Sequence, residues 1–302
     1  MENIIKYYYN INAKDLKYID NHYEFYLNNI LYYFTPVDII NEKELLSLKE
    51  ININNKLAHN IVFNRFNKLL SNYNGINYIL MEIYINPRKK IQLREIEYIA
   101  NTIMINSKEN YINWGWLWSK KIDYLEMQIN EIGKKYPILV NTFSFFVGLC
   151  ENAISYFNNN VKKDDTSLVL SHNKIKPNDT IISLYDPLNT KLDHKARDLS
   201  EYIKLSFFQN NKYIFKELND YFKRNFYSKN DMYILFSRIL YPSFYFDLYD
   251  NIIIGSINEE DIIYITNNID EYINYLYNVY LYLNNYYNLE EIPWLKKKVN
   301  QH

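Results

Sequence analysis

Side chains that could do chemistry gather between residues 170 and 198. Asp179, Asp186, Asp193 and Asp198 supply carboxylates there, and His172 and His194 supply imidazoles. His194 follows Asp193 directly, which suggests a general acid–base pair. Adjacent residues of an extended segment point to opposite sides, so we discount that pair. His172 is expected to be a hydrogen-bonded structural residue.

The rest of the chain excludes several classes of function. Cys150 is the only cysteine, so neither an internal disulfide nor a cysteine-based zinc site can form, and its apolar neighbours predict a buried thiol. Lys and Arg total 34 against 35 Asp and Glu, so no positive excess exists to bind a nucleic acid. No G-x-S-x-G hydrolase element occurs, and the other histidines lack metal-ligand spacing. These histidines are His22, His59 and His302.

The first 86 residues are predicted to form strands with one helix. Asn28-Asn29 separates two apolar stretches and predicts a β-hairpin, and Asn41 is a candidate N-cap for the helix. Pro87 and the basic residues after it indicate a boundary between two lobes at residues 86 and 87. The strands are expected at 23–27, 30–34, 61–64 and 78–84.

From about residue 92 the apolar residues recur at helical spacing. Pro137 separates one amphipathic helix from a more apolar one at 139–158, which we expect to be the buried central helix. Short strands are expected at 168–170, 180–183 and 191–192, and a long last helix at 259–287. The pattern predicts an α+β protein with two lobes, a small β-rich lobe at 1–86 and a large helical lobe at 87–302.

Three other features bear on location and surface. The N-terminus lacks the basic and apolar regions of a signal peptide, and no run of 18 apolar residues predicts a membrane span. The 33 tyrosines reflect either an AT-rich genome or a surface suited to packing and cross-linking in an assembly. Trp114, Trp116 and Trp118 are expected on one face of an extended segment. We favour packing for them, with a partner-binding or carbohydrate-stacking surface as the alternative.

The segment 170–182 resembles the catalytic loop L-V-H-G-D-L-H-P-G-N-I-L-V of the aminoglycoside phosphotransferase and choline kinase-like family. Its apolar frame, His172 and Pro177 match that loop. Nearly the whole chain also resembles the CotS-related group of kinase-like spore coat proteins. The segments that carry this second resemblance are 114–118, 121–126, 145–156, 193–203 and 292–295. Both resemblances imply a two-lobed kinase-like fold with its catalytic loop at 170–198.

The resemblance also implies that groups needed to bind a nucleotide are missing. A phosphate-covering loop needs glycines so that backbone N–H groups approach the phosphates, and the first glycine is Gly75. The third strand should carry a lysine, yet residues 30–37 contain none. A helix glutamate would normally pair with that lysine. The candidates for that position are Glu42, Glu44 and Glu50.

The catalytic loop departs from the family pattern as well. Lys174 stands where the catalytic aspartate should be, and an amine accepts no proton at neutral pH unless it is strongly desolvated. Asp179 replaces the metal-binding asparagine, Asp193 fits the second metal aspartate, and Asp198 fits the aspartate that supports the loop. In this resemblance Asp179 and Asp193 could form a residual cation site, and the blander interpretation is two surface carboxylates without a metal. Asp186 is closer to His172 and would leave too little chain for the expected hairpin, so we prefer Asp193 as the second metal aspartate.

We therefore predict a non-catalytic, kinase-like component of the bacterial spore coat, made in the cytoplasm. Its expected partners are other spore coat proteins, with no nucleic acid, no membrane insertion and no cofactor. Residual Mg²⁺ binding by Asp179 and Asp193 is the less favoured alternative. The rival functions are an active small-molecule phosphotransferase with rearranged residues, in which Asp179 and Asp193 hold Mg²⁺, and a kinase-like protein that binds a small ligand without catalysis.

Overall fold

The computed structural model describes residues 1–19, 21–38, 41–53, 58–83, 90–102, 104–105, 111–163, 168–175 and 179–299. The chain forms two compact units. Unit 1 contains Met1–Thr102 and His172–Lys191, and unit 2 contains Ile103–Ser171 and Leu192–His302. The expected lobe boundary at 86 and 87 lies outside the described residues. Unit 1 runs beyond it and takes in a second, later segment of the chain.

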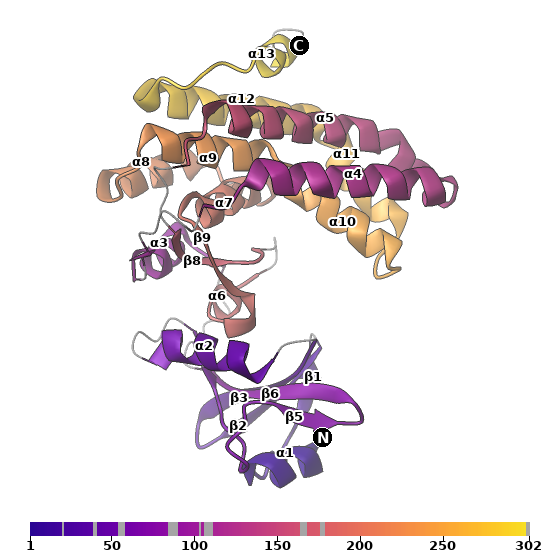
Figure 1. The fold of residues 1–302 in the computed structure, drawn as a ribbon, viewed down its shortest axis with the longest axis vertical. Helices are drawn as coiled ribbons and strands as arrows, with labels where there is room; N and C mark the ends of the chain where they lie inside the picture. The colour runs from indigo at the N-terminus through magenta and orange to yellow at the C-terminus, as the bar shows by residue number, and fades with distance from the viewer. Residues whose placement is uncertain are drawn as a thin grey trace. The chain divides into compact units, whose positions relative to one another are not determined.

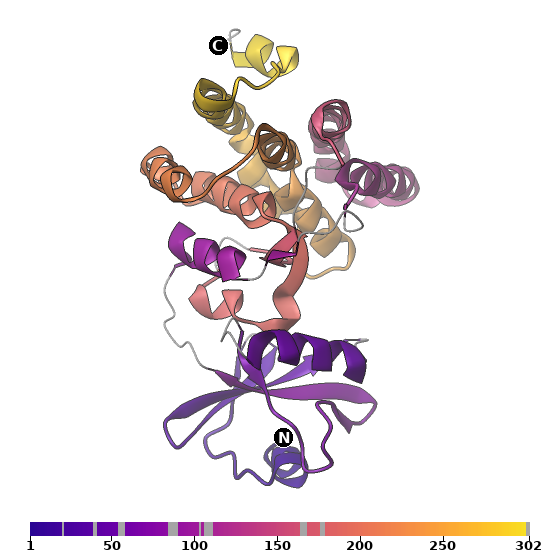
Figure 2. The same ribbon diagram turned by 60° about the vertical axis from the view of Figure 1, so that its left-hand side comes forward.

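Unit 1 is built on one antiparallel sheet with helices on both faces (Figures 1 and 2). The strand order is β1-β2-β3-β6-β4, and β5 also pairs with β6. The predicted hairpin is confirmed as β2 and β3, with Leu27 opposite Ile30. The elements are α1 (Glu2–Tyr9), β1 (Lys17–Ile19), β2 (His22–Leu27), β3 (Ile30–Val37), α2 (Glu42–Ile53), β4 (Asn60–Ile61), β5 (Ser71–Tyr73), β6 (Ile76–Ile83), α3 (Leu93–Thr102), α6 (Ile181–Leu184) and η3 (Pro187–Asn189).

The sheet has an apolar core on each face because side chains alternate along its strands. Ile79 and Met81 of β6 join one core with Leu45 of α2, while Tyr78 and Leu80 join the other with residues of α1. Burial on both faces explains why β6 is apolar along most of its length rather than alternating. Tyr84 and the residues that follow it in the predicted strand lie outside the described residues.

The strand predicted at 180–183 is wrong. Thr180 makes a single bridge to Lys90, and the chain then turns into the short helix α6. Its apolar residues Ile181, Ile182 and Leu184 are buried. The β-branched residues Thr180, Ile181 and Ile182 suggested a strand, but the burial of Ile182 in the core of unit 1 overrides that local preference.

Unit 2 is mainly helical, with α4 and α5 side by side (Figures 1 and 2). A small sheet has the order β7-β8-β9. Its elements are β7 (Met104–Ile105), α4 (Trp114–Ile132), η2 (Gly133–Lys135), α5 (Pro137–Asn160), β8 (Leu168–His172), β9 (Thr190–His194), α7 (Ala196–Phe208), α8 (Ile214–Arg224), α9 (Lys229–Leu240), α10 (Ser243–Ile253), η4 (Glu259–Ile262), α11 (Ile263–Asn267), α12 (Ile269–Tyr287) and α13 (Pro293–Val299). The last residue of β8, His172, and the first two residues of β9, Thr190 and Lys191, belong to unit 1.

The central helix of unit 2 is α9 rather than α5, which corrects the expectation from sequence. Every residue of α9 from Asn230 to Leu240 is buried, whereas α5 exposes polar residues such as Asn141 and Glu151. Asp231 and Arg238 are buried within α9 although they are charged. Helix α5 is long and apolar enough to cross a membrane by length and composition. It packs against α4 and α9, as core helices do.

Two further predictions for unit 2 need correction. The helix expected at 259–287 is divided into the 3₁₀-helix η4, the helix α11 that follows it directly, and α12, which Asn268 separates from α11. The three tryptophans lie at the start of helix α4, where the Asn113 side chain accepts a hydrogen bond from the Trp116 N–H. Trp114 and Trp118 therefore share a face, with ring centroids 6.0 Å apart, and Trp116 points elsewhere and is 57% exposed.

Candidate functional site

The loop after β8 is fastened within unit 1 by two side chains. His172 is buried, and its Nε2 donates to the carbonyl of Leu184 at 2.8 Å. The Asn189 side chain accepts from the Lys174 N–H at 3.1 Å and donates to the Lys174 carbonyl at 2.9 Å. These contacts join His172 and Lys174 to α6 and η3. Pro177, which also matches the family loop, lies outside the described residues.

Lys174 and Asp179 take the positions of the catalytic and metal-binding residues in this loop. Lys174 is exposed, so it lacks the burial that could turn an amine into a base. Asp179 is half-buried next to the bridge that Thr180 makes with Lys90. The loop therefore presents a cation where a general base is required.

Asp186 also lies in unit 1, where its carboxylate accepts from the Leu188 N–H at 2.9 Å. Burial raises the pKa of this carboxyl, and the Leu188 hydrogen bond only partly opposes the rise. Asp186 is the N-cap residue of η3, which gives it a local structural role.

Charged side chains of α2 include the three candidates for the glutamate that would pair with a strand lysine. Glu42 at the start of α2 accepts hydrogen bonds from the N–H groups of Leu69 and Leu70. Lys49 of α2 donates to the Asn60 side chain and the Ile61 carbonyl, each at 2.6 Å. Burial lowers the pKa of Lys49. Glu50 is exposed, and the side chain of Glu44 lies outside the description.

Asp193 has the most distinctive environment among the predicted site residues. Its side chain is fully buried in unit 2, at the end of β9. One carboxylate oxygen accepts from Arg197 Nη1 at 2.7 Å, and the other from Trp114 Nε1 at 3.0 Å and the His194 N–H at 2.7 Å. Arg238 Nη2 lies 3.8 Å away. A Mg²⁺ ion would need these oxygens and would meet two guanidinium groups.

Trp114 and the two arginines form a stack beside Asp193. The Arg238 guanidinium lies 4.3 Å from the Trp114 ring centroid and the Arg197 guanidinium 5.3 Å from it. Burial lowers the pKa of Arg238 to about 10, so the group still carries its charge at neutral pH. The sequence drew attention to Trp114 and to the segment 193–203, which contains Arg197. Arg238 carried no signal, because nothing local to α9 marks it as a partner of Asp193.

His194 turns away from Asp193 and toward Asp231 of α9. Its Nδ1 accepts from the Ala196 N–H at 3.1 Å, so the ring proton is on Nε2, which lies 2.9 Å from Asp231. Lys195 Nζ lies 2.8 Å from the same carboxylate. Burial alone would raise the pKa of Asp231, but these two partners lower it to about 2. His194 thus joins α9 to β9 and forms no acid–base pair with Asp193.

Asp198 is buried in the first turn of α7, where the helix dipole favours a negative charge.

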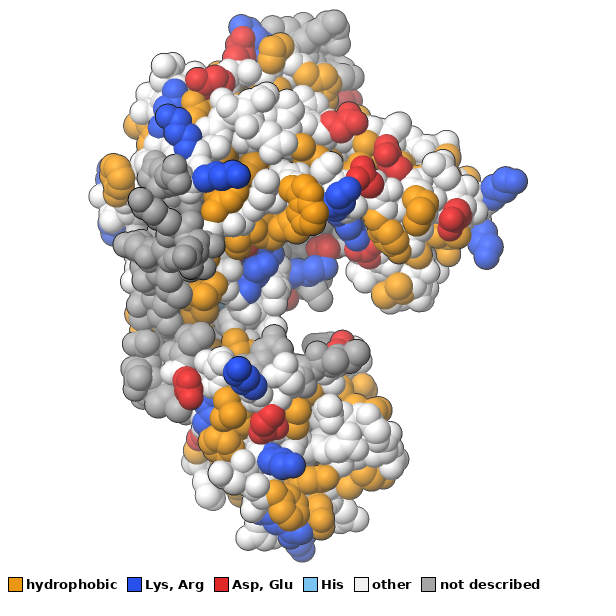
Figure 3. Space-filling view, in the orientation of Figure 1, with side chains coloured by type: hydrophobic (Ala, Val, Ile, Leu, Met, Phe, Trp, Pro, Cys, Tyr) orange, Lys and Arg blue, Asp and Glu red, His pale blue; other side chains and the backbone are white. Residues whose placement is uncertain are grey.

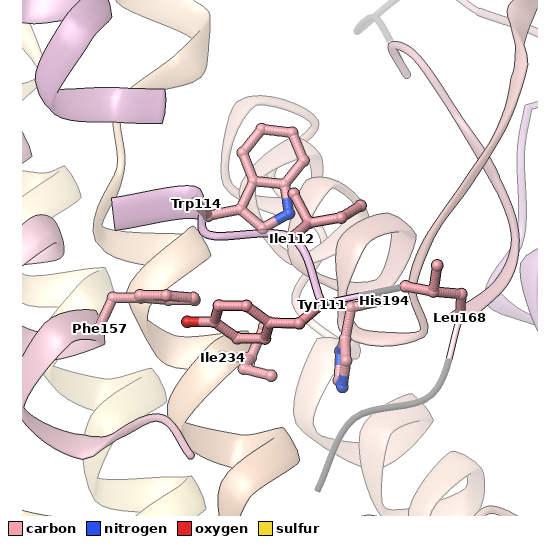
Figure 4. A pocket seen from close by; sticks show the side chains of 7 residues that line it. All are labelled: Tyr111, Ile112, Trp114, Phe157, Leu168, His194 and Ile234. Carbon is pink, nitrogen blue, oxygen red and sulfur yellow. The ribbon is translucent and has the colours of Figure 1, made fainter. Parts of the chain in front are cut away.

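A small cavity lies beside Trp114 and His194 in unit 2 (Figure 4). Its volume is about 10 Å³, enough for one water molecule and far too small for a nucleotide. Its lining is mostly apolar and consists of Tyr111, Ile112, Trp114, Phe157, Leu168, His194 and Ile234.

The predicted site residues are divided between the two units. His172, Lys174 and Asp179 belong to unit 1, and Asp193 and Asp198 belong to unit 2. The cation site predicted from Asp179 and Asp193 would draw on both units and stays a prediction. Among the described residues, no group of three or more His, Cys, Asp or Glu side chains is arranged to hold a metal ion.

Comparison with known proteins identifies the family. The family model described as "Spore coat putative kinase YutH" matches residues 2–285. The chain belongs to the YutH family. The endospore coat-associated protein YutH of Bacillus subtilis is 23% identical over 287 residues, which cover 85% of this chain and 84% of that protein. The resemblance to kinase-like spore coat proteins noted in the sequence is thereby confirmed.

The fold of this YutH family member is that of the aminoglycoside phosphotransferases, which confirms the predicted fold class. A spectinomycin phosphotransferase crystallised with ADP and spectinomycin has a TM-score of 0.59 and 13% identity, with 92% of each chain covered. An aminoglycoside phosphotransferase from Alicyclobacillus acidocaldarius has a TM-score of 0.54 and 8% identity, covering 97% of this chain and 93% of that one. At such low identity the likeness concerns the fold alone.

Proposed function

We propose that the chain is a non-catalytic kinase-like protein that serves as a structural component of the endospore coat. The observation that carries the non-catalytic part is the state of Asp193. This carboxylate is fully buried, and its oxygens are held by Arg197 and the Trp114 indole. A metal aspartate in a phosphotransferase must instead offer its oxygens to Mg²⁺.

Two features of unit 1 support the same proposal. Lys174 carries a positive charge at the loop position of the catalytic base. Strands β1 and β2 end at Ile19 and Leu27, and no glycine precedes Gly75 in the sequence. Backbone N–H groups therefore have no glycine loop from which to approach a triphosphate.

The coat role rests on the family and on the named relative, and surface contacts would carry it out. Large aromatic side chains are exposed on both units, among them Tyr18, Tyr26, Trp116 and Tyr213. Positive and negative side chains are interspersed on the visible face of each unit (Figure 3). Such a mixed surface with exposed aromatic residues suits binding to other coat proteins better than binding to a polyanion. We also propose synthesis in the cytoplasm before assembly on the spore.

The Trp114 indole gives a direct test of the non-catalytic part. Its N–H donates to Asp193, so its NMR resonance will move if Mg²⁺ or Mg²⁺-ATP reaches that carboxylate. We expect no saturable change on titration, with the exposed Trp116 indole as an internal control for bulk effects. A saturable shift of the Trp114 signal that is absent in Asp193→Asn would revive the active phosphotransferase. A shift of other resonances alone would indicate a ligand-binding, non-catalytic protein.

The coat role is tested separately in the sporulating host. A fluorescently tagged chain should co-purify with intact spores and leave them under treatments that extract coat proteins. A tagged chain that stays in the cell fraction while spores form would contradict the coat role. It would leave the interpretation of Asp193 untouched.

A further inference from the structure

The turn between β5 and β6 holds the one asparagine that is followed by glycine. Tyr73 pairs with Ile76, so Asn74 and Gly75 alone form the loop. Their φ angles are 52° and 82°, which is a type I′ turn, and Asn-Gly is the favoured sequence for it. The other four glycines follow Trp, Ile or Val.

The reactive groups of this turn are unprotected. Asn74 and Gly75 are both exposed, and within the described chain neither the Asn74 amide nor the Gly75 N–H makes a hydrogen bond. Apart from its chain neighbours Asn74 and Ile76, no residue has a heavy atom within 4 Å of the point where a Cβ of Gly75 would stand. No other part of the described chain therefore crowds this turn, and Gly75 has no side chain to hinder the attack of its nitrogen on Asn74.

We propose that Asn74 is a site of spontaneous deamidation in the folded protein. The Gly75 nitrogen loses its proton to hydroxide and forms a bond to Asn74 Cγ, which closes a five-membered succinimide. The bond from Cγ to the side-chain nitrogen breaks, and this nitrogen takes a proton from water, which regenerates hydroxide, and leaves as ammonia. Water then opens the ring at either carbonyl and gives aspartate or isoaspartate. No oxidant, reductant or enzyme is required, and the inference does not depend on the proposed function.

The product changes both the charge and the backbone of unit 1. Each conversion adds one negative charge, which takes the formal net charge from −1 to −2. Isoaspartate routes the main chain through the side chain and lengthens the turn by one atom, which breaks the pairing of Tyr73 with Ile76. Strand β5 also receives a hydrogen bond from Tyr8 to the Asn72 carbonyl, so the change reaches the contact with α1.

The chain contains a matched control in the turn between β2 and β3. Asn28 and Asn29 form that two-residue loop between Leu27 and Ile30, with φ angles of 50° and 64°. Both are exposed and, within the described chain, free of hydrogen bonds. The two turns thus share their backbone conformation, and Asn28 differs from Asn74 in being followed by a residue with a side chain. Any free-energy cost of opening a turn before the reaction is therefore common to the β5–β6 turn and the β2–β3 turn.

The test is incubation of the intact chain in warm, mildly alkaline buffer made with H₂¹⁸O. Peptide mass spectrometry then measures the ¹⁸O-labelled aspartate and isoaspartate that form at each asparagine. We expect Asn74 to convert at least about tenfold faster than Asn28, because glycine removes the steric barrier. The rate should rise with pH, because the attacking nitrogen must lose its proton. Equal rates at the two turns, or a rate that is independent of pH, would overturn the proposal.

A gain-of-function variant makes the test independent of the native turn. Asn29→Gly places glycine after Asn28 at a φ of 64°, which glycine accepts without strain. Asn28 should then convert about as fast as Asn74 in the same sample. An Asn28 rate that stays at its original value in the folded variant would contradict the steric argument. If the variant does not fold, the comparison within the unmodified chain still decides.

Discussion

Replacing Arg197 by alanine should cost unit 2 much of its stability, because it leaves the Asp193 carboxylate buried without its closest cation. The Asp193 side chain is fully buried, and Arg197 Nη1 lies 2.7 Å from it. With charge centres about 4 Å apart and an effective dielectric constant of about 20, the lost attraction is about 4 kcal/mol. Removing one partner of a buried pair costs about 3–5 kcal/mol in measured cases. Arg238, already 3.8 Å away, can replace part of the loss, so we expect about 3 kcal/mol.

Urea unfolding followed by tryptophan fluorescence measures this loss in the right part of the chain. All four tryptophans, Trp114, Trp116, Trp118 and Trp294, belong to unit 2. Lys223→Ala is the matched control, because its contact with Asp220 is 3.6 Å long and exposed, and its loss should cost about 0–1 kcal/mol.

The double variant Arg197→Met with Asp193→Asn separates the charge effect from packing. Removing both charges should recover part of the stability that Arg197→Ala loses, because Asp193 no longer buries a charge, while Arg238 loses its nearby carboxylate. A cost below about 1 kcal/mol for Arg197→Ala would refute the interpretation of Asp193 as a carboxylate held by arginine. A double variant as unstable as the single one would assign the loss to packing instead.

Three further predictions follow from local contacts. Asn113→Ala removes the cap on the Trp116 N–H and should destabilise α4 by about 1 kcal/mol, measured by the same fluorescence assay. The pKa of Asp231 is depressed to about 2, so its contribution to the free energy of unfolding is complete above about pH 4 and is lost as the pH falls toward 2. Unfolding at a series of pH values should show a loss of up to about 2.5 kcal/mol. Asp231→Asn should remove this pH dependence. Lys174→Asp should not create phosphotransfer activity, because the glycine loop and the strand lysine are also absent. ATP-dependent phosphorylation by that variant in a labelled-phosphate assay would contradict our account of unit 1.

Local patterns were enough to predict much of the fold. The Asn28-Asn29 turn between two apolar stretches predicted a real hairpin, and helical spacing around Pro137 predicted α4 and α5. The mistakes at 180–183 and 259–287 have different causes, one tertiary and one local. Burial pulled a β-branched segment into the helix α6, and Asn268 interrupted a helix whose apolar period continued through it.

The environment of the site could be predicted only in part. Asp193 was found by its spacing from His172, and its adjacent His194 was correctly set aside as its acid–base partner. Its partners come from α4, α7 and α9, which are distant in sequence, so no local pattern places Arg238 beside it. The tryptophans were misjudged because alternation at every second residue resembles a strand, while a cap at Asn113 starts a helix there.

The most direct test of the central claim is equilibrium binding of Mg²⁺-ATP to the intact chain, read as a change in unfolding free energy. A nucleotide that binds the folded state at one hundred times its dissociation constant stabilises it by about 2.7 kcal/mol. We predict no saturable stabilisation at millimolar Mg²⁺-ATP, since Asp193 is held by Arg197 and no glycine loop covers the phosphates. A saturable stabilisation of that size, lost in Asp193→Asn, would contradict the account.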